Sequence, residues 1–279
     1  MLLSTFIRES SRALLELYPE REAGEIVLRL CEDLLGTGRV EHILNPEREL
    51  PPSRLPELES AFSRLLAGEP LQYVLGYADF CSRRFKVNPS VLIPRPETED
   101  LVRMALSCVG SGSRVLDLCT GSGCIAWTVA LECPQARVFA VDISSEALET
   151  AAGQFEGLGP DFICADILKP LDLPQCSFDV IISNPPYVMD REKSSMRRNV
   201  LEYEPGLALF VPDGDPLLFY RAIAVRAREL LKPSGKAFLE INETLGPQTL
   251  SIFREEGMAD CGISEDFAGK QRYLHFQKT

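Results

Sequence analysis

The chain has 279 residues, of which 45% are hydrophobic and 25% are charged. This composition excludes a disordered, collagen-like or disulfide-stapled protein, and the length predicts one large and one small domain. The 29 basic and 41 acidic residues give a net charge of −12. Proteins that bind nucleic acids or anionic membranes normally carry the opposite charge, so neither is expected as the main partner.

The N-terminus and the cysteines indicate the compartment. Residues 1–17 lack the basic start of a signal peptide, and no apolar stretch approaches the roughly 18 residues that a membrane span requires. The nine cysteines form no CxxC pair and several lie in apolar runs, which is typical of free thiols in a reducing compartment. We therefore expect a cytoplasmic protein without a structural zinc site.

The first part of the chain has a helical pattern. Apolar residues recur at intervals of three and four, as in Ala23, Val27 and Leu30, and this predicts a small helical domain over residues 1–70. Tyr, Phe and Val then alternate with polar residues in residues 71–93, where Asn-Pro adds a turn signal. We expect a β-hairpin connector there.

Residues 94–279 alternate between strand and helix patterns. Short apolar runs predict buried parallel strands at residues 114–118, 137–142, 161–166, 178–183 and 236–241. Helical stretches separate them around residues 99–109, 123–132, 145–153 and 215–231. Residues 261–265 and 272–277 predict a closing antiparallel pair. The alternation predicts a doubly wound, Rossmann-like α/β sheet that binds ligands at the carboxyl ends of its strands.

A glycine-containing loop follows the first predicted strand of the sheet. It consists of Cys119, Thr120, Gly121, Ser122 and Gly123. Glycines allow the backbone to approach a ligand closely, and a helix begins directly afterwards. Asp142 ends the next strand, 19 residues after Gly123, where a carboxylate reaches ribose hydroxyls. The pattern predicts an adenosine-type cofactor; the alternative is a tight turn with Asp142 capping the next helix.

The loop alone leaves the cofactor open. Residues 121–126 match the G-x-G-x-x-G/A pattern of dinucleotide-binding proteins, which keeps a nicotinamide enzyme as an alternative. Asp117, just before the loop, favours a cationic ligand such as a sulfonium and repels a pyrophosphate. Asp166, which closes the third predicted strand, is either an acceptor for an adenine amino group or a turn residue.

The segment after strand 178–183 consists of Asn184, Pro185, Pro186 and Tyr187. Two prolines remove two backbone N–H groups and fix φ at both positions, which leaves a rigid rim of free carbonyl oxygens. A planar NH₂ group has two in-plane hydrogens, which the Asn184 side-chain oxygen and the Pro185 carbonyl can accept. Tyr187 can pack against the flat group. We favour this interpretation over a Pro-Pro turn with a buried tyrosine.

Two further segments accompany these motifs: GEPLQYVLG at residues 68–76 and IPRPETE at residues 93–99. Together with DLCTGSG, NPPY, LEIN and the terminal AGKQRY, they occur in the order typical of one family. The chain resembles the HemK/PrmC family of release factor glutamine N5-methyltransferases, which have the class I S-adenosylmethionine-dependent fold. The resemblance extends over essentially the whole chain.

The resemblance implies that S-adenosylmethionine is the cofactor. The residues implied to hold it are the loop 119–123, Asp142, Ile167, which lies against the adenine, and Asn184. Two features of this cofactor site depart from the family pattern. Cys119 stands in place of the usual first glycine, and Ile167 is aliphatic where some relatives have an aromatic residue.

The resemblance also implies the substrate and the reaction. Residues 184–187 receive the glutamine side chain of the Gly-Gly-Gln loop of class I peptide chain release factors, so that Asn184, Pro185, Pro186 and Tyr187 bind the substrate. Asn184, Pro185 and Tyr187 are the implied catalytic residues of the methyl transfer, which belongs to translation termination. The helical domain 1–70 is the candidate for binding the release factor.

No general base is expected, because an amide proton becomes acidic only as the new N–C bond forms. We interpret His42 and His275 as structural residues. Asn242 is a third departure, since the family commonly has glycine there. The alternatives are a DNA or RNA amino-methyltransferase, a nicotinamide oxidoreductase, and a protein that binds a cofactor only to scaffold a translation factor. We expect a monomer.

Overall fold

The computed structural model describes residues 1–279, which divide into two compact units. The helical unit consists of Met1–Tyr77 and Arg197–Tyr203, and the sheet unit consists of Ala78–Met196 and Glu204–Thr279. Each unit has a hydrophobic core of its own. None of the helices combines the length and the apolar character that a membrane crossing requires.

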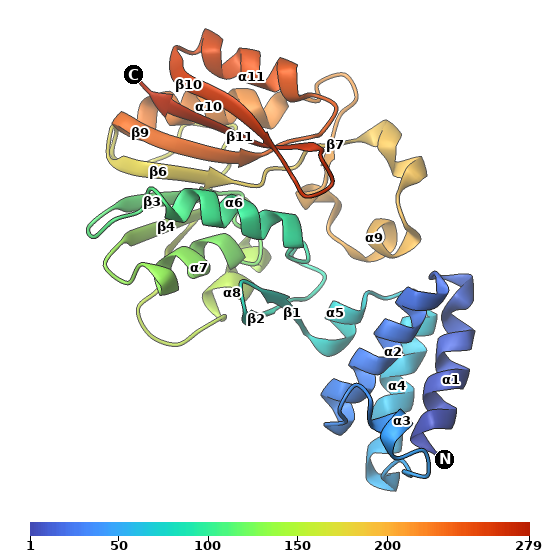
Figure 1. Ribbon diagram of the computed structural model, residues 1–279. Helices are drawn as coiled ribbons and strands as arrows, with labels where there is room; N and C mark the ends of the chain where they lie inside the picture. The colour runs from blue at the N-terminus through green and yellow to red at the C-terminus, as the bar shows by residue number, and fades with distance from the viewer. The chain divides into compact units, whose positions relative to one another are not determined.

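The helical unit is built from amphipathic helices, of which α1, α2 and α4 pack side by side (Figure 1). Their apolar faces meet in a core that includes Phe6, Val27, Leu30, Leu58 and Leu65. The helices of this unit are α1 (Leu3–Ala13), α2 (Glu20–Leu35), α3 (Glu41–Leu44), α4 (Leu55–Leu66), α5 (Leu71–Leu75) and α9 (Arg198–Tyr203).

Helix α5 occupies residues that the sequence placed in the hairpin connector. Leu71–Leu75 form a short helix that begins after Pro70 and ends at Gly76, whose φ of +79° is left-handed. Proline before a first turn and glycine after a last turn are ordinary helix boundaries. In so short an apolar run, these boundary residues outweigh the alternating pattern.

Helix α9 is far away in the sequence and nevertheless belongs to the helical unit. The Tyr203 hydroxyl donates a hydrogen bond of 3.0 Å to the Ala67 carbonyl oxygen. Arg197, just before the helix, forms an ion pair with Glu22. The apolar periodicity of residues 1–70 gives no indication of this added segment.

The sheet unit contains a seven-stranded sheet in the order β10-β11-β9-β6-β3-β4-β5. The strands β3, β4, β5, β6 and β9 are parallel, whereas β11 is antiparallel to β9 and β10. This topology confirms the predicted doubly wound fold. The strands are β3 (Arg114–Leu118), β4 (Arg137–Asp142), β5 (Asp161–Cys164), β6 (Phe178–Ser183), β9 (Leu231–Glu240), β10 (Met258–Glu265) and β11 (Gln271–Lys278).

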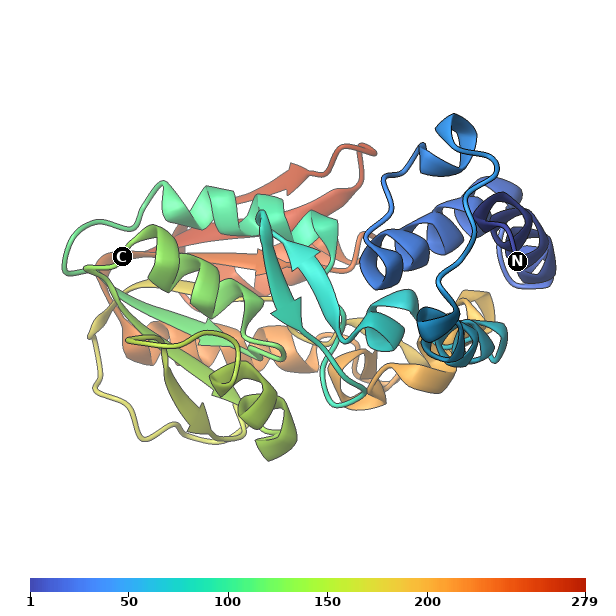
Figure 2. The ribbon, with the colours of Figure 1, turned by 90° about the horizontal axis from the view of Figure 1, so that it is seen from below.

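Helices cover both faces of this sheet (Figures 1 and 2). Along β3, Val115 contacts the core beneath α6 and α7, while Leu116 and Leu118 contact the core beneath α10 and α11. This alternation is the period of two that a strand buried on both faces requires. The helices are α6 (Pro96–Leu106), α7 (Cys124–Glu132), α8 (Ser145–Ala152), α10 (Leu218–Leu230) and α11 (Gly246–Glu255).

Strand β9 begins earlier than predicted, at Leu231 instead of residue 236. The pairing of β9 with β6 shifts register between Phe178 and Val180, so the Lys-Pro-Ser-Gly stretch after Leu231 belongs to an irregular part of the ladder. Two short parallel strands, β7 (Val188–Met189) and β8 (Phe210–Val211), follow the proline motif and were not expected from the sequence.

The hairpin of β1 (Tyr77–Phe80) and β2 (Arg83–Lys86) lies beside the helices of one sheet face (Figure 2). Phe85 packs edge-to-face on Phe155, with ring centroids 5.3 Å apart. The buried Gln154 side chain bonds both backbone groups of Lys86, at 2.7 and 2.8 Å, and the carbonyl of Ser122, at 3.0 Å. Gln154 thereby joins the hairpin to the loop before α7.

We expect the variant Gln154→Ala to lower the free energy of unfolding by about 1–3 kcal/mol, because it leaves three backbone groups without their partner in a buried place. Urea denaturation measures this change. Gln248→Ala, at an exposed position, is the matched control and should be neutral. Equal stability of the two variants would contradict the joining role of Gln154.

Candidate active site

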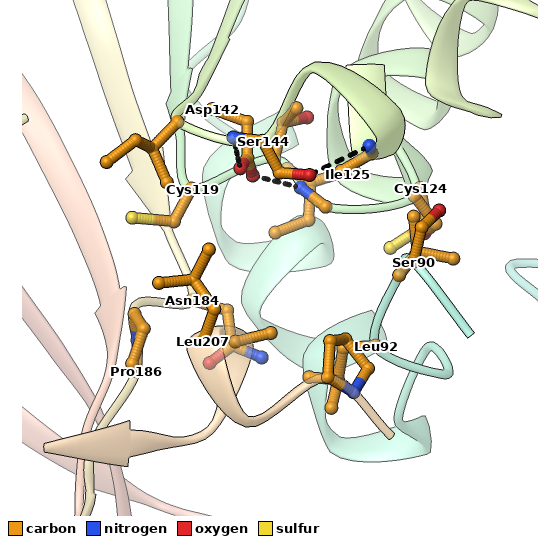
Figure 3. Close-up of a pocket in the computed structure, with 18 of the residues that line it drawn as sticks. Ser90, Leu92, Cys119, Cys124, Ile125, Asp142, Ser144, Asn184, Pro186 and Leu207 are labelled. Carbon is orange, nitrogen blue, oxygen red and sulfur yellow. Dashed lines mark hydrogen bonds between the residues drawn. The ribbon is translucent and has the colours of Figure 1, made fainter. Parts of the chain in front are cut away.

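A cavity of about 410 Å³ lies within the sheet unit, where β3, β4 and β6 end. Ligand sites of doubly wound sheets are expected at this edge, next to the point where the strand order reverses. Figure 3 shows Asp142 and Ser144 on one side of the cavity and Asn184, Pro186 and Leu207 across from them. The cavity therefore brings the glycine loop, its acidic partner and the proline motif together.

The glycine loop reaches α7 through three left-handed residues. Cys119, Gly121 and Gly123 have φ values of +61°, +54° and +77°. A Cβ on Gly123 would lie 2.9 Å from the Cβ of Ala151, so a side chain does not fit there. Cys119 adopts the left-handed conformation without being glycine, which strains the backbone. The cavity is lined by Cys119, Thr120, Gly121 and Ser122, but not by Gly123.

Asp142 faces the cavity at the end of β4 and also holds the loop. Its two carboxylate oxygens accept backbone hydrogen bonds from Gly121, at 2.8 Å, and from Ser144, at 3.0 Å. Burial raises the pKa of this carboxyl, and the backbone donors oppose the shift. The cap of α8 is supplied by Ser144, whose hydroxyl accepts from the Ala147 N–H. Each Asp142 oxygen keeps a lone pair for a ligand.

Asp117 lies beneath the loop and is not exposed to the cavity. It is fully buried and accepts a hydrogen bond of 2.5 Å from the Thr120 hydroxyl. Burial raises the pKa of Asp117 to about 7, and the nearby charge of Asp142 adds to the increase. The sequence suggested that Asp117 contacts the ligand directly. In the structure its carboxylate does not reach the cavity.

The wall beyond β5 contains Asp166 and Ile167, both of which line the cavity. Ile167 is buried in the core, so it presents a fixed apolar surface. The Asp166 carboxylate accepts the Leu168 N–H at 2.9 Å and forms an ion pair with Lys169. Asp166 thus acts as a turn residue, which is one of the two roles that the sequence allowed.

Asn184 and Pro186 line the cavity, whereas Pro185 and Tyr187 do not. The Asn184 Nδ2 donates to the Thr98 hydroxyl oxygen at 3.2 Å, and no protein donor reaches its Oδ1. The backbone hydrogen bonds of the chain leave the Pro185 carbonyl oxygen unused. Two free acceptors thus remain at this turn.

The end of β9 holds Tyr187 from two sides. Glu240 accepts a hydrogen bond of 2.7 Å from the Tyr187 hydroxyl, and the Asn242 side-chain amide donates to the Tyr187 carbonyl at 3.1 Å. Burial, followed by the charge of Glu240, raises the pKa of Tyr187 well above its ordinary value, so the phenol stays protonated. Asn242, which departs from the family pattern, therefore anchors the proline motif.

Several cavity residues were not predicted from the sequence. Two groups of them lie in residues 90–98 and residues 205–208, where the lining side chains are mostly apolar. The buried Glu204 carboxylate ties the two segments together, since it accepts from the Ile93 N–H at 3.1 Å and pairs with Arg95 at 2.7 Å. The IPRPETE motif was the available signal for the first segment; the second carries no comparable motif.

Comparisons with known proteins agree with this geometry. Residues 115–202 match the family described as "Methyltransferase domain", and residues 6–76 match the "PrmC N-terminal domain". A solved methyltransferase from Pyrococcus furiosus shares the fold, with a TM-score of 0.52 and 17% identity over 81% of this chain and 98% of that chain. The sheet unit is thus a methyltransferase domain of the Rossmann-like class.

Two curated relatives extend over nearly the whole chain. The release factor glutamine methyltransferase of Bacteroides thetaiotaomicron is 42% identical, with 98% of each chain covered. The enzyme of the same name from Flavobacterium psychrophilum is 38% identical, again with 98% of each chain covered. The chain belongs to the release factor glutamine methyltransferase family, which confirms the resemblance drawn from its motifs.

The raised pKa of Asp117 predicts a loss of stability with rising pH. The folded state holds the Asp117 proton more tightly than the unfolded chain, so the contribution is present below the ordinary value of 3.8 and is lost as pH rises to about 7. We expect Asp117→Asn to reduce the fall in unfolding free energy between about pH 5 and about pH 8. Urea denaturation at both pH values measures it, with the exposed Asp172→Asn as control. An unchanged fall in Asp117→Asn would show that Asp117 does not titrate there.

Proposed function

We propose that this protein transfers a methyl group from S-adenosylmethionine to the glutamine side-chain amide of the Gly-Gly-Gln motif of class I peptide chain release factors. The observation that carries the proposal is that Asn184 lines the same cavity as the glycine loop and Asp142. Full-length relatedness to enzymes named release factor glutamine methyltransferases supports it.

The residues around the cavity fit S-adenosylmethionine. The volume of about 410 Å³ suits a nucleoside-sized ligand. Asp142 has lone pairs left for two ribose hydroxyls, Ile167 offers an apolar surface for adenine, and Gly121 leaves open space because nothing lies within 4 Å of where its Cβ would be. The Asp142 carboxylate, which lines the cavity, favours a cation over a pyrophosphate.

Asn184 and Pro185 supply the substrate side. An amide NH₂ group offers two donors, and the free Asn184 Oδ1 and Pro185 carbonyl oxygen are two acceptors at one turn. Held at both hydrogens, the amide cannot rotate, and its nitrogen stays oriented toward the cavity. Tyr187 supports this turn through its hydrogen bond to Glu240 and does not line the cavity.

The chain acts by positioning and electrostatics. S-adenosylmethionine supplies, when bound, a methyl carbon whose bond to sulfur breaks as the bond to the amide nitrogen forms, the sulfur taking the electron pair. Asn184 and the Pro185 carbonyl stabilise the positive charge that develops on the amide nitrogen. The displaced amide proton leaves to solvent, so no side chain is needed as a general base.

The helical unit is proposed to contribute to binding the release factor. Its match to the PrmC N-terminal domain supports this role. Val40, Ile43 and Leu44, around the short helix α3, are exposed by 52, 67 and 69%. Clustered exposed apolar side chains are typical of a surface that contacts another protein.

The test of the function is intact-mass analysis of a purified class I release factor after incubation with this protein and S-adenosylmethionine. One added methyl group on the Gly-Gly-Gln peptide is the expected result. Ribosomal RNA and DNA are assayed in parallel for methyl transfer. Transfer to either nucleic acid without transfer to the release factor would contradict the proposal.

We expect Asp142→Ala to weaken S-adenosylmethionine binding about 10- to 100-fold, because it removes charge-assisted hydrogen bonds to the ribose worth roughly 1.5–3 kcal/mol. Calorimetric titration gives the dissociation constant. Since Asp142 also holds Gly121 and Ser144, circular dichroism must first show a folded variant. Asp172→Ala is the control, and an unchanged dissociation constant in Asp142→Ala would remove Asp142 from the cofactor site.

We expect Asn184→Ala to lower the rate of methyl transfer by about 10²–10³-fold with much less effect on cofactor affinity, since it removes an oriented acceptor whose contribution grows in the transition state. Single-turnover methylation of a release factor at saturating S-adenosylmethionine isolates this effect from binding. A rate within a few-fold of the wild-type rate would mean that the proline motif serves only as scaffold.

A further inference from the structure

A buried chain of hydrogen bonds lies behind Asn184. Thr98, in the first turn of α6, donates to Glu240 at 2.7 Å and accepts from the Asn184 Nδ2 at 3.2 Å. The second oxygen of Glu240 accepts from the Tyr187 hydroxyl at 2.7 Å. Thr98 and Glu240 are each 2% exposed. Elements far apart in sequence thus converge on the proline motif, and of the two buried residues Thr98 lines the cavity whereas Glu240 does not.

The number of protons available in this hydrogen-bond network determines which group donates and which accepts. In its ionised form Glu240 has only acceptors, so both Thr98 and Tyr187 then donate their single hydroxyl proton to it, as the two hydrogen bonds have it. Thr98 then has only lone pairs to offer Asn184, so the Asn184 end that faces it must be the NH₂ group. The Asn184 Oδ1 is consequently left as the free acceptor.

We propose that Thr98 and Glu240 are positioning residues that fix the Asn184 side-chain amide with its Oδ1 free to accept the substrate. This inference rests on the proposed function of Asn184. Glu240 accepts the hydrogen bond of the Thr98 hydroxyl, so Thr98 can only accept from the Asn184 amide. Tyr187, at the far end of the proline motif, donates to the same carboxylate. Neither Thr98 nor Glu240 takes part in bond making.

Protonation of Glu240 removes the constraint. A neutral carboxyl group donates to Thr98, which is then able to donate to Asn184 and to turn the Oδ1 away from the substrate. Burial raises the pKa of Glu240, Arg272 on β11 opposes the increase, and Glu97 on α6 adds to it. Three tyrosines also face this carboxylate: Tyr187, Tyr220 on α10 and Tyr273 on β11. The constraint is therefore lost on the acid side.

The first test compares Thr98→Val, which removes the hydroxyl at nearly constant volume, with Thr98→Ser, which keeps it. We expect Thr98→Val to lower the single-turnover rate of release factor methylation about 10- to 100-fold, with S-adenosylmethionine affinity within about twofold of wild type. Thr98→Ser should restore most of the rate. Thr249→Val is the control, because Thr249 is equally buried and its hydroxyl bonds only the Leu245 carbonyl of its own helix.

The kinetic comparison has outcomes that overturn the proposal. A wild-type rate in Thr98→Val does so, and so does an equal loss in Thr98→Ser or a loss explained by weaker cofactor binding. The pH dependence adds a second readout. The wild-type rate should fall as pH is lowered toward the raised pKa of Glu240, and Glu240→Gln should lack this acid limb. Persistence of the limb in Glu240→Gln at saturating S-adenosylmethionine, where the titration of Asp142 no longer limits cofactor binding, contradicts the role of Glu240.

A spectroscopic test does not depend on methyl transfer. The side-chain NH₂ signal of Asn184 in nitrogen-15 NMR is identified as the one that Asn184→Ala deletes. We expect this signal to move in Thr98→Val and to stay in place in Thr249→Val. An unmoved signal in Thr98→Val overturns the positioning role. If the wild-type protein methylates no release factor, the proposed function fails, and the NMR result still decides whether Thr98 holds Asn184.

Discussion

The site depends on one constraint, which is that parallel strands end at the same edge of a sheet. Because β3, β4 and β6 run in the same direction, Cys119, Asp142 and Asn184 follow or end their strands at one cavity. Strand β9 is parallel to β6 and brings Glu240 to the same edge. The local sequence thus sets which functional residue stands at the end of each strand, and the common direction of the strands brings these residues together.

This constraint explains which parts of the protein could be predicted from sequence. Local sequence patterns predict the parallel strands and the residues at their ends. For this reason the sequence was sufficient to identify the sheet, the glycine loop and Asn184. Thr98 and Glu240 lie 142 positions apart, and their hydrogen bond has no local signature. The short helix α5 was missed because its boundary residues, Pro70 and Gly76, determine its form more than its apolar pattern does.

Three carboxyl groups near the cavity have a raised pKa because they are buried: Asp117, Asp142 and Glu240. Burying a carboxylate costs free energy unless hydrogen bonds compensate, and the donors here differ. Asp142 is held by backbone N–H groups and Glu240 by two hydroxyls, whereas Asp117 is held by the Thr120 hydroxyl and the Ala126 backbone. Hydroxyls can reverse their direction and backbone donors cannot, so Asp142 is the most firmly defined of the three acceptors.

The allocation of Arg197–Tyr203 to the helical unit has a consequence for engineering this protein. The chain passes between its two units after Tyr77, before Arg197 and after Tyr203, so no single cut releases either one. A truncation of Met1–Tyr77 would leave Tyr203 without Ala67 and Arg197 without Glu22, exposing a short helix on the remaining fragment. An independent methyltransferase module would therefore need a designed linker in place of Arg197–Tyr203, connecting Met196 to Glu204.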